Sequence, residues 1–417
     1  MVEKPFGMHS CYRNILSLSL KPSPAAKTAV AGERITARRE AFGDLILDRR
    51  TGQLQVRDQS ASFPSFLSAP TTVSIALTGR CNLRCQHCYP TVRNAQLSFP
   101  AVARLLDELH TMGVFSLSLS GGEPLLHPDL ESIITLGHEK GFHHLLFTNG
   151  LLITEQKAHR LKALGVDEVN ISLDAADADQ HDRFRGVSGA FGKGVQAVRH
   201  CVRAGLDTWI TCTVNNAVQV RAVDMVQLAL DLGASRLRFV QVVNSGNAAL
   251  QGLMYDSAWT EQLDEVLTLM RDRTGRDYRP ASYFDFQAWR GIFRTDTPYS
   301  PYGCGAGTLR ARITADGRVL ACPFVSDKLP SADGPVKPDS ILEKPFTEIW
   351  RHSPYLAVFR FGTLEVKGKC SVCEHNQLWC RAGCRAEAFF QSHVLDESDP
   401  LCDYQPQGQT VDGPRKT

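Results

Sequence analysis

The sequence predicts an α/β fold in which six strand–helix units form a partial (β/α)6 barrel, followed by a cysteine-rich C-terminal domain. Three observations lead to this prediction. Short β-branched or aromatic runs alternate with segments of helical period, the 417 residues exceed the ~150 of one ordinary domain, and most of the thirteen cysteines fall into two groups. Six units are fewer than the eight of a closed barrel, so we expect an open sheet.

The predicted strands share β-branched or aromatic composition, and each precedes a segment with helical spacing. They are Thr72–Thr78, Phe115–Ser120, His143–Thr148, Glu168–Asp174, Thr208–Asn215 and Arg236–Val243. Typical helix signals follow them: the helix predicted at Pro100–Met112 begins after Ser98 and stops before Gly113. The alternation predicts a parallel sheet with helices packed against it.

Composition divides the chain into five parts. Residues 1–70 are an N-terminal extension with a β-hairpin at Phe42–Val56 and a low-complexity arm at Pro22–Gly32. Residues 71–255 form the partial barrel, and residues 256–300 a linker with one helix at Trp259–Arg271. Residues 301–405 form the cysteine-rich domain, and residues 406–417 a tail.

Charge and hydropathy exclude several classes of protein. The formal net charge is +2, which argues against a nucleic-acid partner. No apolar run approaches the ~18 residues that span a bilayer, and Met1–Leu16 has no continuous apolar core, so we expect no membrane partner and a cytoplasmic location. Because the cytosol keeps thiols reduced, thirteen cysteines then indicate metal or redox chemistry better than disulfides.

The first cysteine group, Cys81, Cys85 and Cys88, directly follows the first predicted strand. Active sites of parallel βα folds lie at this carboxyl edge of the sheet. A compact loop with three thiolates can hold three irons of a [4Fe-4S] cluster and leave the fourth iron open. The alternatives are a zinc site, which normally needs four ligands, or ordinary buried thiols. We interpret His87, inside the loop, as structural.

Further motifs follow other predicted strands. Gly121-Gly122-Glu123-Pro124 ends the second strand, and Ser172-Leu173-Asp174 ends the fourth. Together with the C-x3-C-x2-C spacing, they resemble the radical S-adenosylmethionine (radical SAM) superfamily. The resemblance implies that the Gly-Gly-Glu-Pro motif receives the methionine amino group of the cofactor and that Ser172 helps to hold the cofactor.

Four more residues are candidate cofactor contacts. In some members of the family a basic residue pairs with the methionine carboxylate; Arg185 or Lys193 could serve, or either could be a solvated surface charge. Asn149 and Asn215 end the third and fifth strands, so the topology places both at the same carboxyl edge of the sheet as the cysteine loop. Asparagine at a strand end is, however, commonly a turn residue.

The family's chemistry depends on the open iron. The resemblance implies that S-adenosylmethionine chelates this iron, that one electron cleaves its C–S bond, and that a 5'-deoxyadenosyl radical abstracts hydrogen from a substrate. The protein would supply ligation, orientation and exclusion of water. We assign no catalytic side chain from the sequence.

The second cysteine group resembles the SPASM extension of radical SAM maturases, with one extra residue between its fourth and fifth cysteines. The group comprises Cys304, Cys322, Cys370, Cys373, Cys380, Cys384 and Cys402. Family analogy implies two auxiliary iron-sulfur clusters: an inner one on Cys304, Cys322 and Cys384 with an open iron, and an outer one on the other four cysteines. A zinc ribbon is the alternative for residues 370–384.

The leading functional hypothesis is modification of a ribosomally made peptide by crosslinking, epimerisation, decarboxylation or dehydrogenation. An edge of the Phe42–Val56 hairpin could bind the peptide as an added strand, and flavodoxin or ferredoxin could donate the electron. A second enzyme hypothesis is side-chain chemistry on a tetrapyrrole in haem synthesis, a small cofactor precursor, because His181–Gly186 and Lys344–Trp350 are similar to such relatives. The non-enzyme alternative is a zinc- or cluster-stabilised binding module.

Overall fold

The computed structural model describes most of the barrel and parts of both flanking regions. It describes residues 15–19, 35–48, 53–57, 65–89, 92–254, 262–274, 281–282, 305–325, 329, 334–360, 365–374, 376, 382–400, 402 and 405–406. Cys304, Cys380 and the predicted arm Pro22–Gly32 lie outside these residues.

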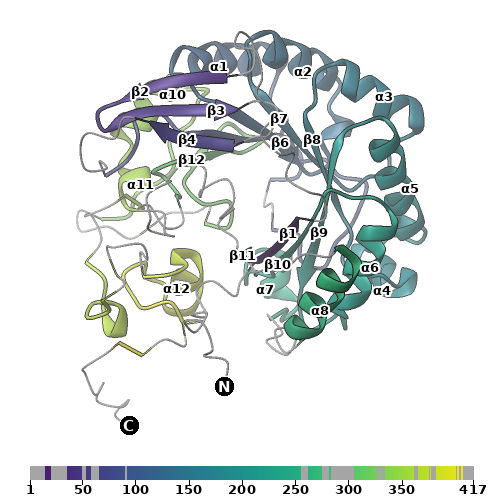
Figure 1. Cartoon of the computed structure of the whole chain (residues 1–417). Helices are drawn as coiled ribbons and strands as arrows, with labels where there is room; N and C mark the ends of the chain where they lie inside the picture. Colours follow the sequence, from purple (N-terminus) through teal and green to yellow (C-terminus); the bar gives the residue numbers. More distant parts are fainter. Residues whose placement is uncertain are drawn as a thin grey trace.

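Six parallel strands form the centre of the molecule and confirm the predicted fold class (Figure 1). They are β5 (Thr72–Thr78), β6 (Ser116–Gly121), β7 (His143–Thr148), β8 (Glu168–Ser172), β9 (Asp207–Val214) and β10 (Arg236–Gln241). Each pairs in parallel with the next in sequence order, as consecutive right-handed βαβ units do. Each lies within two residues of its predicted bounds.

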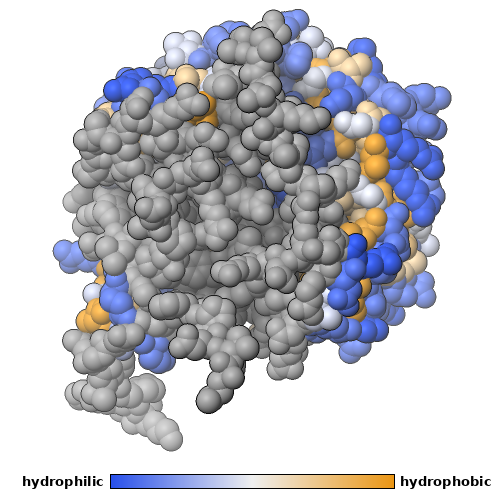
Figure 2. Space-filling view, viewed as in Figure 1, coloured by the Kyte–Doolittle hydropathy of each residue, from blue (hydrophilic) through white to orange (hydrophobic). Residues whose placement is uncertain are grey.

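Helices cover the outer face of this curved sheet (Figure 1). They are α1 (Phe99–Thr111), α2 (Leu130–Glu139), α3 (Glu155–Ala163), α4 (Ala178–Arg185), α5 (Ala190–Arg203), α6 (Ala222–Asp231), α7 (Asn247–Leu250) and α8 (Leu263–Thr274). Ser98 caps α1, because its side chain accepts a hydrogen bond from the Ala101 amide at 3.4 Å. The outer surface of the helices at the right of Figure 2 is mainly hydrophilic, as expected of solvent-facing sides.

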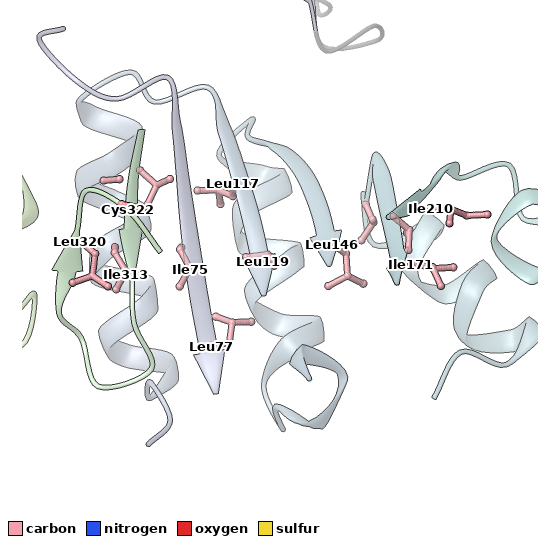
Figure 3. Close-up of a cluster of buried hydrophobic side chains, with 14 of the residues drawn as sticks. Ile75, Leu77, Leu117, Leu119, Leu146, Ile171, Ile210, Ile313, Leu320 and Cys322 are labelled. Atoms are coloured by element: carbon pink, nitrogen blue, oxygen red, sulfur yellow. The ribbon is translucent and has the colours of Figure 1, made fainter. Parts of the chain in front are cut away.

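The two faces of the sheet differ in polarity. Alternate residues such as Ile75, Leu117 and Ile171 belong to one buried apolar cluster that packs with the helices (Figure 3). On the opposite, inner face of β6, Ser116, Ser118 and Ser120 are only half-buried. The core therefore lies between the sheet and the helices, and the inside of the partial barrel is polar.

Both edges of the sheet continue beyond the six strands. β1 (Ile15–Ser19) pairs antiparallel with β10 and with β11 (Ala281–Ser282). At the other edge, β12 (Arg310–Ile313) pairs in parallel with β5 and antiparallel with β13 (Val319–Leu320). The ten-stranded sheet thus includes strands from the predicted N-terminal extension and from the predicted cysteine-rich domain.

A second, three-stranded antiparallel sheet lies beside the barrel. It consists of β2 (Ile35–Glu40), β3 (Gly43–Asp48) and β4 (Gln53–Arg57), and the Phe42–Val56 segment falls on β3 and β4. Arg38 joins this sheet to the barrel: its buried guanidinium donates to the carbonyls of Ala69, Pro70 and Gly113 and pairs with Glu40 at 2.8 Å. The sheet is therefore held by buried polar contacts next to the start of β5.

Three helices follow in the C-terminal region: α10 (Phe346–His352), α11 (Pro354–Ala357) and α12 (Arg385–Ser392). The indole of Trp350 is fully buried and donates to the Leu67 carbonyl at 2.9 Å, which ties α10 to the segment before β5.

None of the helices that the structure describes has the length and apolar character needed to span a bilayer.

Candidate active site at the cysteine loop

The loop with Cys81, Cys85 and Cys88 begins three residues after β5, at the carboxyl edge of the parallel strands. Backbone hydrogen bonds hold it against the end of α4: the Arg84 amide donates to the Arg185 carbonyl at 3.1 Å, and the Gln86 amide to the Phe184 carbonyl at 3.0 Å. Cys81 is exposed, Cys85 is buried and Cys88 is half-buried. The three thiols therefore sit on a fixed loop, with one thiol open to solvent.

The segment after β10 supports the loop from another side, which the sequence analysis did not predict. The Asn247 amide donates to the Cys88 carbonyl at 2.9 Å, and the Asn247 side chain donates to the Cys85 carbonyl at 3.3 Å. A Cβ on Gly246 would lie 2.8 Å from the Cys88 carbonyl oxygen, so only glycine permits this approach. The Ser245-Gly246-Asn247 sequence resembles an ordinary turn, and only the fold shows that it contacts the loop.

The Gly-Gly-Glu motif packs directly against the chain that leads into the loop. The Gly122 amide donates to the Thr78 carbonyl at 2.7 Å, and the Glu123 amide to the Arg80 carbonyl at 2.8 Å. A Cβ on Gly122 would lie 2.2 Å from the Arg80 carbonyl oxygen. The glycine requirement at this position therefore arises from close contact between the end of β6 and the chain that follows β5.

Glu123 is completely buried at this junction. Its carboxylate accepts hydrogen bonds from the Thr148 hydroxyl at 2.8 Å, the Asn149 amide at 2.8 Å and the Leu125 amide at 3.1 Å. Burial raises its pKa to about 7, although these three donors act in the opposite direction. A nearby cation would favour the charged form, so the site is suited to an ammonium group.

Asn149 links the Glu123 junction to the cysteine loop. Its side-chain amide donates to Asn82 Oδ1 at 2.7 Å and lies 3.9 Å from Cys81 Sγ. Its own backbone amide binds Glu123. The structure thus brings together three predicted site residues, Cys81, Glu123 and Asn149.

Arg185 joins the buried side of the loop to the end of β8. Its guanidinium forms a 2.5 Å ion pair with Asp174, and its Nη1 lies 3.6 Å from Cys85 Sγ. Burial opposes the Asp174 charge, but the Arg185 cation, two nearby histidines and the Thr213 amide together outweigh burial and hold the Asp174 pKa below its usual value. Burial likewise opposes the Arg185 charge, and Asp174 keeps its pKa raised. The surface-charge alternative for Arg185 is therefore wrong.

The remaining predicted contacts lie in different surroundings. Ser172 is half-buried at the end of β8, Pro124 is buried beside Glu123, and Lys193 is exposed on the first turn of α5. Asn215 is fully buried: its amide donates to the Thr213 carbonyl at 2.9 Å and accepts from the Ala217 and Val218 amides. Asn215 thus forms a turn in this structure, the alternative that its residue type suggested.

His87 stacks on Phe184, with ring centroids 4.7 Å apart and an interplanar angle of 12°. Burial lowers its pKa to about 4, so the ring is neutral near pH 7. This packing agrees with the structural interpretation of His87.

The second cysteine group is described at five positions. Asp399 links two of them: its carboxylate accepts from the Cys384 amide at 2.7 Å, and its carbonyl accepts from the Cys402 amide at 3.2 Å. Ser398 accepts from the Cys370 amide at 3.0 Å, and the Cys373 amide donates to the Cys370 carbonyl. Cys322 belongs to the buried apolar cluster that includes Leu320 (Figure 3), and Cys384 packs against the same cluster.

The first cysteine loop has the surroundings of an iron-sulfur site. Fe–S clusters are bound by thiolates, and hydrogen-bond donors near the sulfurs tune them. Here Arg185 and Asn149 direct N–H groups at Cys85 and Cys81. In the described part of the chain, no three His, Cys, Asp or Glu side chains form a ligand group for one metal ion.

The chain is similar to known proteins over most of its length. The Radical SAM superfamily model matches residues 75–224, and the SPASM model, an iron-sulfur cluster-binding domain, matches residues 304–375. The AdoMet-dependent heme synthase of Nitratidesulfovibrio vulgaris is 30% identical over 366 residues, which cover 82% of this chain and 95% of that protein. The chain belongs to the radical SAM superfamily, in its SPASM-containing branch. It is therefore an enzyme that uses a [4Fe-4S] cluster and S-adenosylmethionine, with further iron-sulfur binding in its SPASM domain.

Other relatives of this radical SAM enzyme have different names. The PqqA peptide cyclase of Streptomyces rochei is 29% identical over 358 residues, covering 83% of this chain and 93% of that protein. The crystal structure of Streptococcus suis SuiB bound to the precursor peptide SuiA matches with a TM-score of 0.71 at 16% identity, over 90% of this chain and all of SuiB. This last likeness concerns the fold.

Proposed function

We propose that this radical SAM enzyme modifies a ribosomally made peptide. The observation that carries the proposal is the three-stranded sheet β2–β3–β4, which Arg38 fixes beside the barrel. Among the described strands, β4 pairs only with β3, so it offers an edge at which a peptide can add as a further strand. The name of the PqqA peptide cyclase specifies a peptide and supports the same class of substrate.

The residues around the loop have separate roles in this proposal. Cys81, Cys85 and Cys88 hold the cluster, Arg185 and Asn149 donate toward its sulfur ligands, and Glu123 faces the ammonium group of the cofactor. When bound, the cluster and S-adenosylmethionine supply the one-electron cleavage that starts hydrogen abstraction. The chain orients the reactants and excludes water.

The other cofactor and metal contacts belong to the same proposal. Gly121, Gly122, Pro124 and Ser172 line the cofactor site, while Lys193 and Asn215 have the weakest support because one is exposed and the other forms a turn. Seven cysteines bind two auxiliary clusters, and flavodoxin or ferredoxin supplies the electron in the cytoplasm. Asp399, which joins Cys384 to Cys402, supports a shared cysteine-rich site.

A second candidate is side-chain chemistry on a tetrapyrrole. The heme synthase of Nitratidesulfovibrio vulgaris favours it, because its 30% identity is similar to that of the peptide cyclase. We favour the peptide because the β2–β3–β4 sheet has a free edge among the described strands. A tetrapyrrole has no peptide backbone that could pair with this edge.

The test uses anaerobic, cluster-loaded protein with S-adenosylmethionine and a chemical reductant. A candidate precursor peptide encoded near the gene is incubated with the enzyme and analysed by mass spectrometry, with coproporphyrin III in a parallel reaction. The proposal expects a mass change in the peptide that requires S-adenosylmethionine, accompanied by 5'-deoxyadenosine.

A matched variant tests the docked sheet. Arg38→Met should reduce peptide modification more than it reduces 5'-deoxyadenosine formation without peptide. The carbonyls that Arg38 binds precede β5 and β6, whereas the cysteine loop follows the opposite end of β5. Conversion of the porphyrin with no change in any candidate peptide would instead establish the second candidate.

A further inference from the structure

Three neighbouring strands place polar side chains in one row on the inner face of the barrel. Arg312 of β12 is paired with Ser74 of β5, and Ser74 is paired with Ser118 of β6. All three are half-buried, whereas the residues on either side of each in sequence are buried in the apolar cluster or beside it. Because adjacent strands lie ~4.8 Å apart, the row spans about 10 Å.

Arg312 is directed toward the cysteine loop. Its guanidinium carbon lies 5.5 Å from the ring centroid of Tyr89, the residue that follows Cys88. The Tyr89 ring also contacts Phe324, two residues after Cys322, with centroids 5.0 Å apart. The guanidinium therefore lies beside a short aromatic bridge between the two cysteine groups.

The row has unused hydrogen-bonding capacity. Among the described residues no carboxylate forms an ion pair with Arg312, and the side-chain hydroxyls of Ser74 and Ser118 donate no hydrogen bond. The buried arginines Arg38 and Arg185, by contrast, each form an ion pair with a carboxylate. A cation on the inner face without such a partner leaves room for an anionic ligand.

We propose that Arg312, Ser74 and Ser118 bind a carboxylate group of the substrate. A guanidinium offers two parallel N–H groups that match a carboxylate, and hydroxyls from the neighbouring strands can donate to the same group. The inference rests on the proposed function and deepens it, because it selects a substrate with an acidic side chain or a carboxyl terminus. The propionate of a tetrapyrrole has the same chemistry, so the test separates the two sources.

The experiment measures equilibrium binding to the anaerobic, cluster-loaded enzyme. One pair of probes is a candidate precursor peptide and the same peptide with Asn and Gln in place of Asp and Glu, ending in a carboxamide. The other pair is coproporphyrin III and its tetramethyl ester. Wild type should bind the acidic member of one pair more tightly, and Arg312→Met should weaken that binding about tenfold to a hundredfold, as loss of a charge-assisted hydrogen bond does.

Three further variants make the result specific. Ser118→Ala should weaken binding of the same acidic probe about threefold to tenfold, and Arg312→Lys should keep part of the preference because it keeps the charge. Ser116→Ala is the control: it lies on the same face of β6 one row away, opposite Thr72, and should change nothing. Iron content and 5'-deoxyadenosine formation without substrate should stay at wild-type levels in all four variants.

Two outcomes would overturn the proposal. The first is a wild-type enzyme that binds the acidic and neutral members of both pairs equally. The second is an Arg312→Met enzyme that keeps the wild-type preference, or one whose main defect is weaker S-adenosylmethionine binding. A preference confined to the porphyrin pair would support the carboxylate site and refute the peptide function.

Discussion

Arg185 shows how a single residue connects the fold with the cysteine loop. Its guanidinium is buried between the Asp174 carboxylate, 2.5 Å away, and Cys85 Sγ, 3.6 Å away. Asp174 in turn accepts the Thr213 amide of β9 at 2.9 Å. The position of the loop therefore depends on a charge pair that is completely enclosed by β8, β9 and α4.

Removing one partner of this ion pair should lower the free energy of unfolding. Arg185→Met leaves the Asp174 charge buried without its cation, so we expect a loss of about 3–5 kcal/mol in the free energy of unfolding. Anaerobic denaturant titration measures it. The double variant Arg185→Met with Asp174→Asn should recover part of the loss, because no unpaired charge remains. Additive losses in the double variant would show that the two residues do not act as a pair.

His144 should make the stability of the folded protein depend on pH, and this effect does not involve the cysteines. Burial lowers its pKa to about 4 from an ordinary 6.5, so the folded state holds it neutral. The unfolded chain binds the proton first as pH falls, and the stabilising effect of neutral His144 is lost from about pH 6.5 downward.

Between pH 7.5 and 5.5, wild type should therefore lose about 1 kcal/mol more stability than His144→Gln does. Comparison of the two proteins cancels the contributions of other histidines, such as His87 and His181. Equal pH dependence in both proteins would mean that His144 already titrates normally.

Individual elements follow the sequence patterns most closely where a strand is buried by local partners. β5 and β7 have the bounds predicted from their apolar and β-branched residues, and α1 begins directly after Ser98, as predicted. β1 was not predicted, because its partner β10 lies more than 200 residues away. β12 was not predicted either, because it carries arginine at alternate positions. Arginine fits these positions because the face of the strand that carries it lines the polar interior of the barrel.

The residues of the candidate site likewise fall into those that the sequence predicts and those that only the fold reveals. The spacing of Cys81, Cys85 and Cys88 predicts the loop, because all three ligands are local in sequence. The supports from Arg185 and Asn247 depend on elements that the chain reaches about 100 and 160 residues later. No local pattern encodes such contacts.

Within α2, Gly137 should resist a change that usually strengthens a helix. Alanine is favoured over glycine in helix interiors by about 1 kcal/mol, but a Cβ at Gly137 would lie 2.3 Å from Nε2 of the buried His144 ring. Gly137→Ala should therefore lower stability by about 1–3 kcal/mol. Thermal unfolding provides the measurement.

Gly192 in α5 is the matched control, because nothing lies within 4 Å of the Cβ that alanine would add there. Gly192→Ala should raise stability by up to about 1 kcal/mol. If both variants gained stability equally, the helix–strand contact at His144 would be looser than the structure shows.

On the scale of the whole molecule, one continuous sheet links the first cysteine group with Cys322 of the second group. The first group follows β5, and Cys322 follows β13, which is joined to β5 through β12. Of the other described cysteines, Cys384 and Cys402 are hydrogen-bonded to Asp399, and Cys370 is hydrogen-bonded to Ser398. The sheet thus connects the first cysteine loop with Cys322 of the second group.

Replacing Cys81, Cys85 and Cys88 together with alanine should abolish reductive cleavage of S-adenosylmethionine and leave the auxiliary clusters in place. Iron analysis should fall by about four from a wild-type value of roughly ten to twelve per chain. Unchanged 5'-deoxyadenosine formation would refute the assignment of this loop. A wild-type count of about four irons with zinc would refute the auxiliary clusters.

The pairing of β5 with β12 also has a consequence for synthesis on the ribosome. Thr71 and Leu309, which are hydrogen-bonded at this seam, are 238 residues apart. At roughly 5–20 residues per second, the edge of β5 waits about 10–50 s after it emerges before its neighbour exists. During this interval an unpaired apolar strand edge is available to other nascent chains. Slower translation downstream of β5 should therefore increase aggregation, whereas the same slowing after β12 should not.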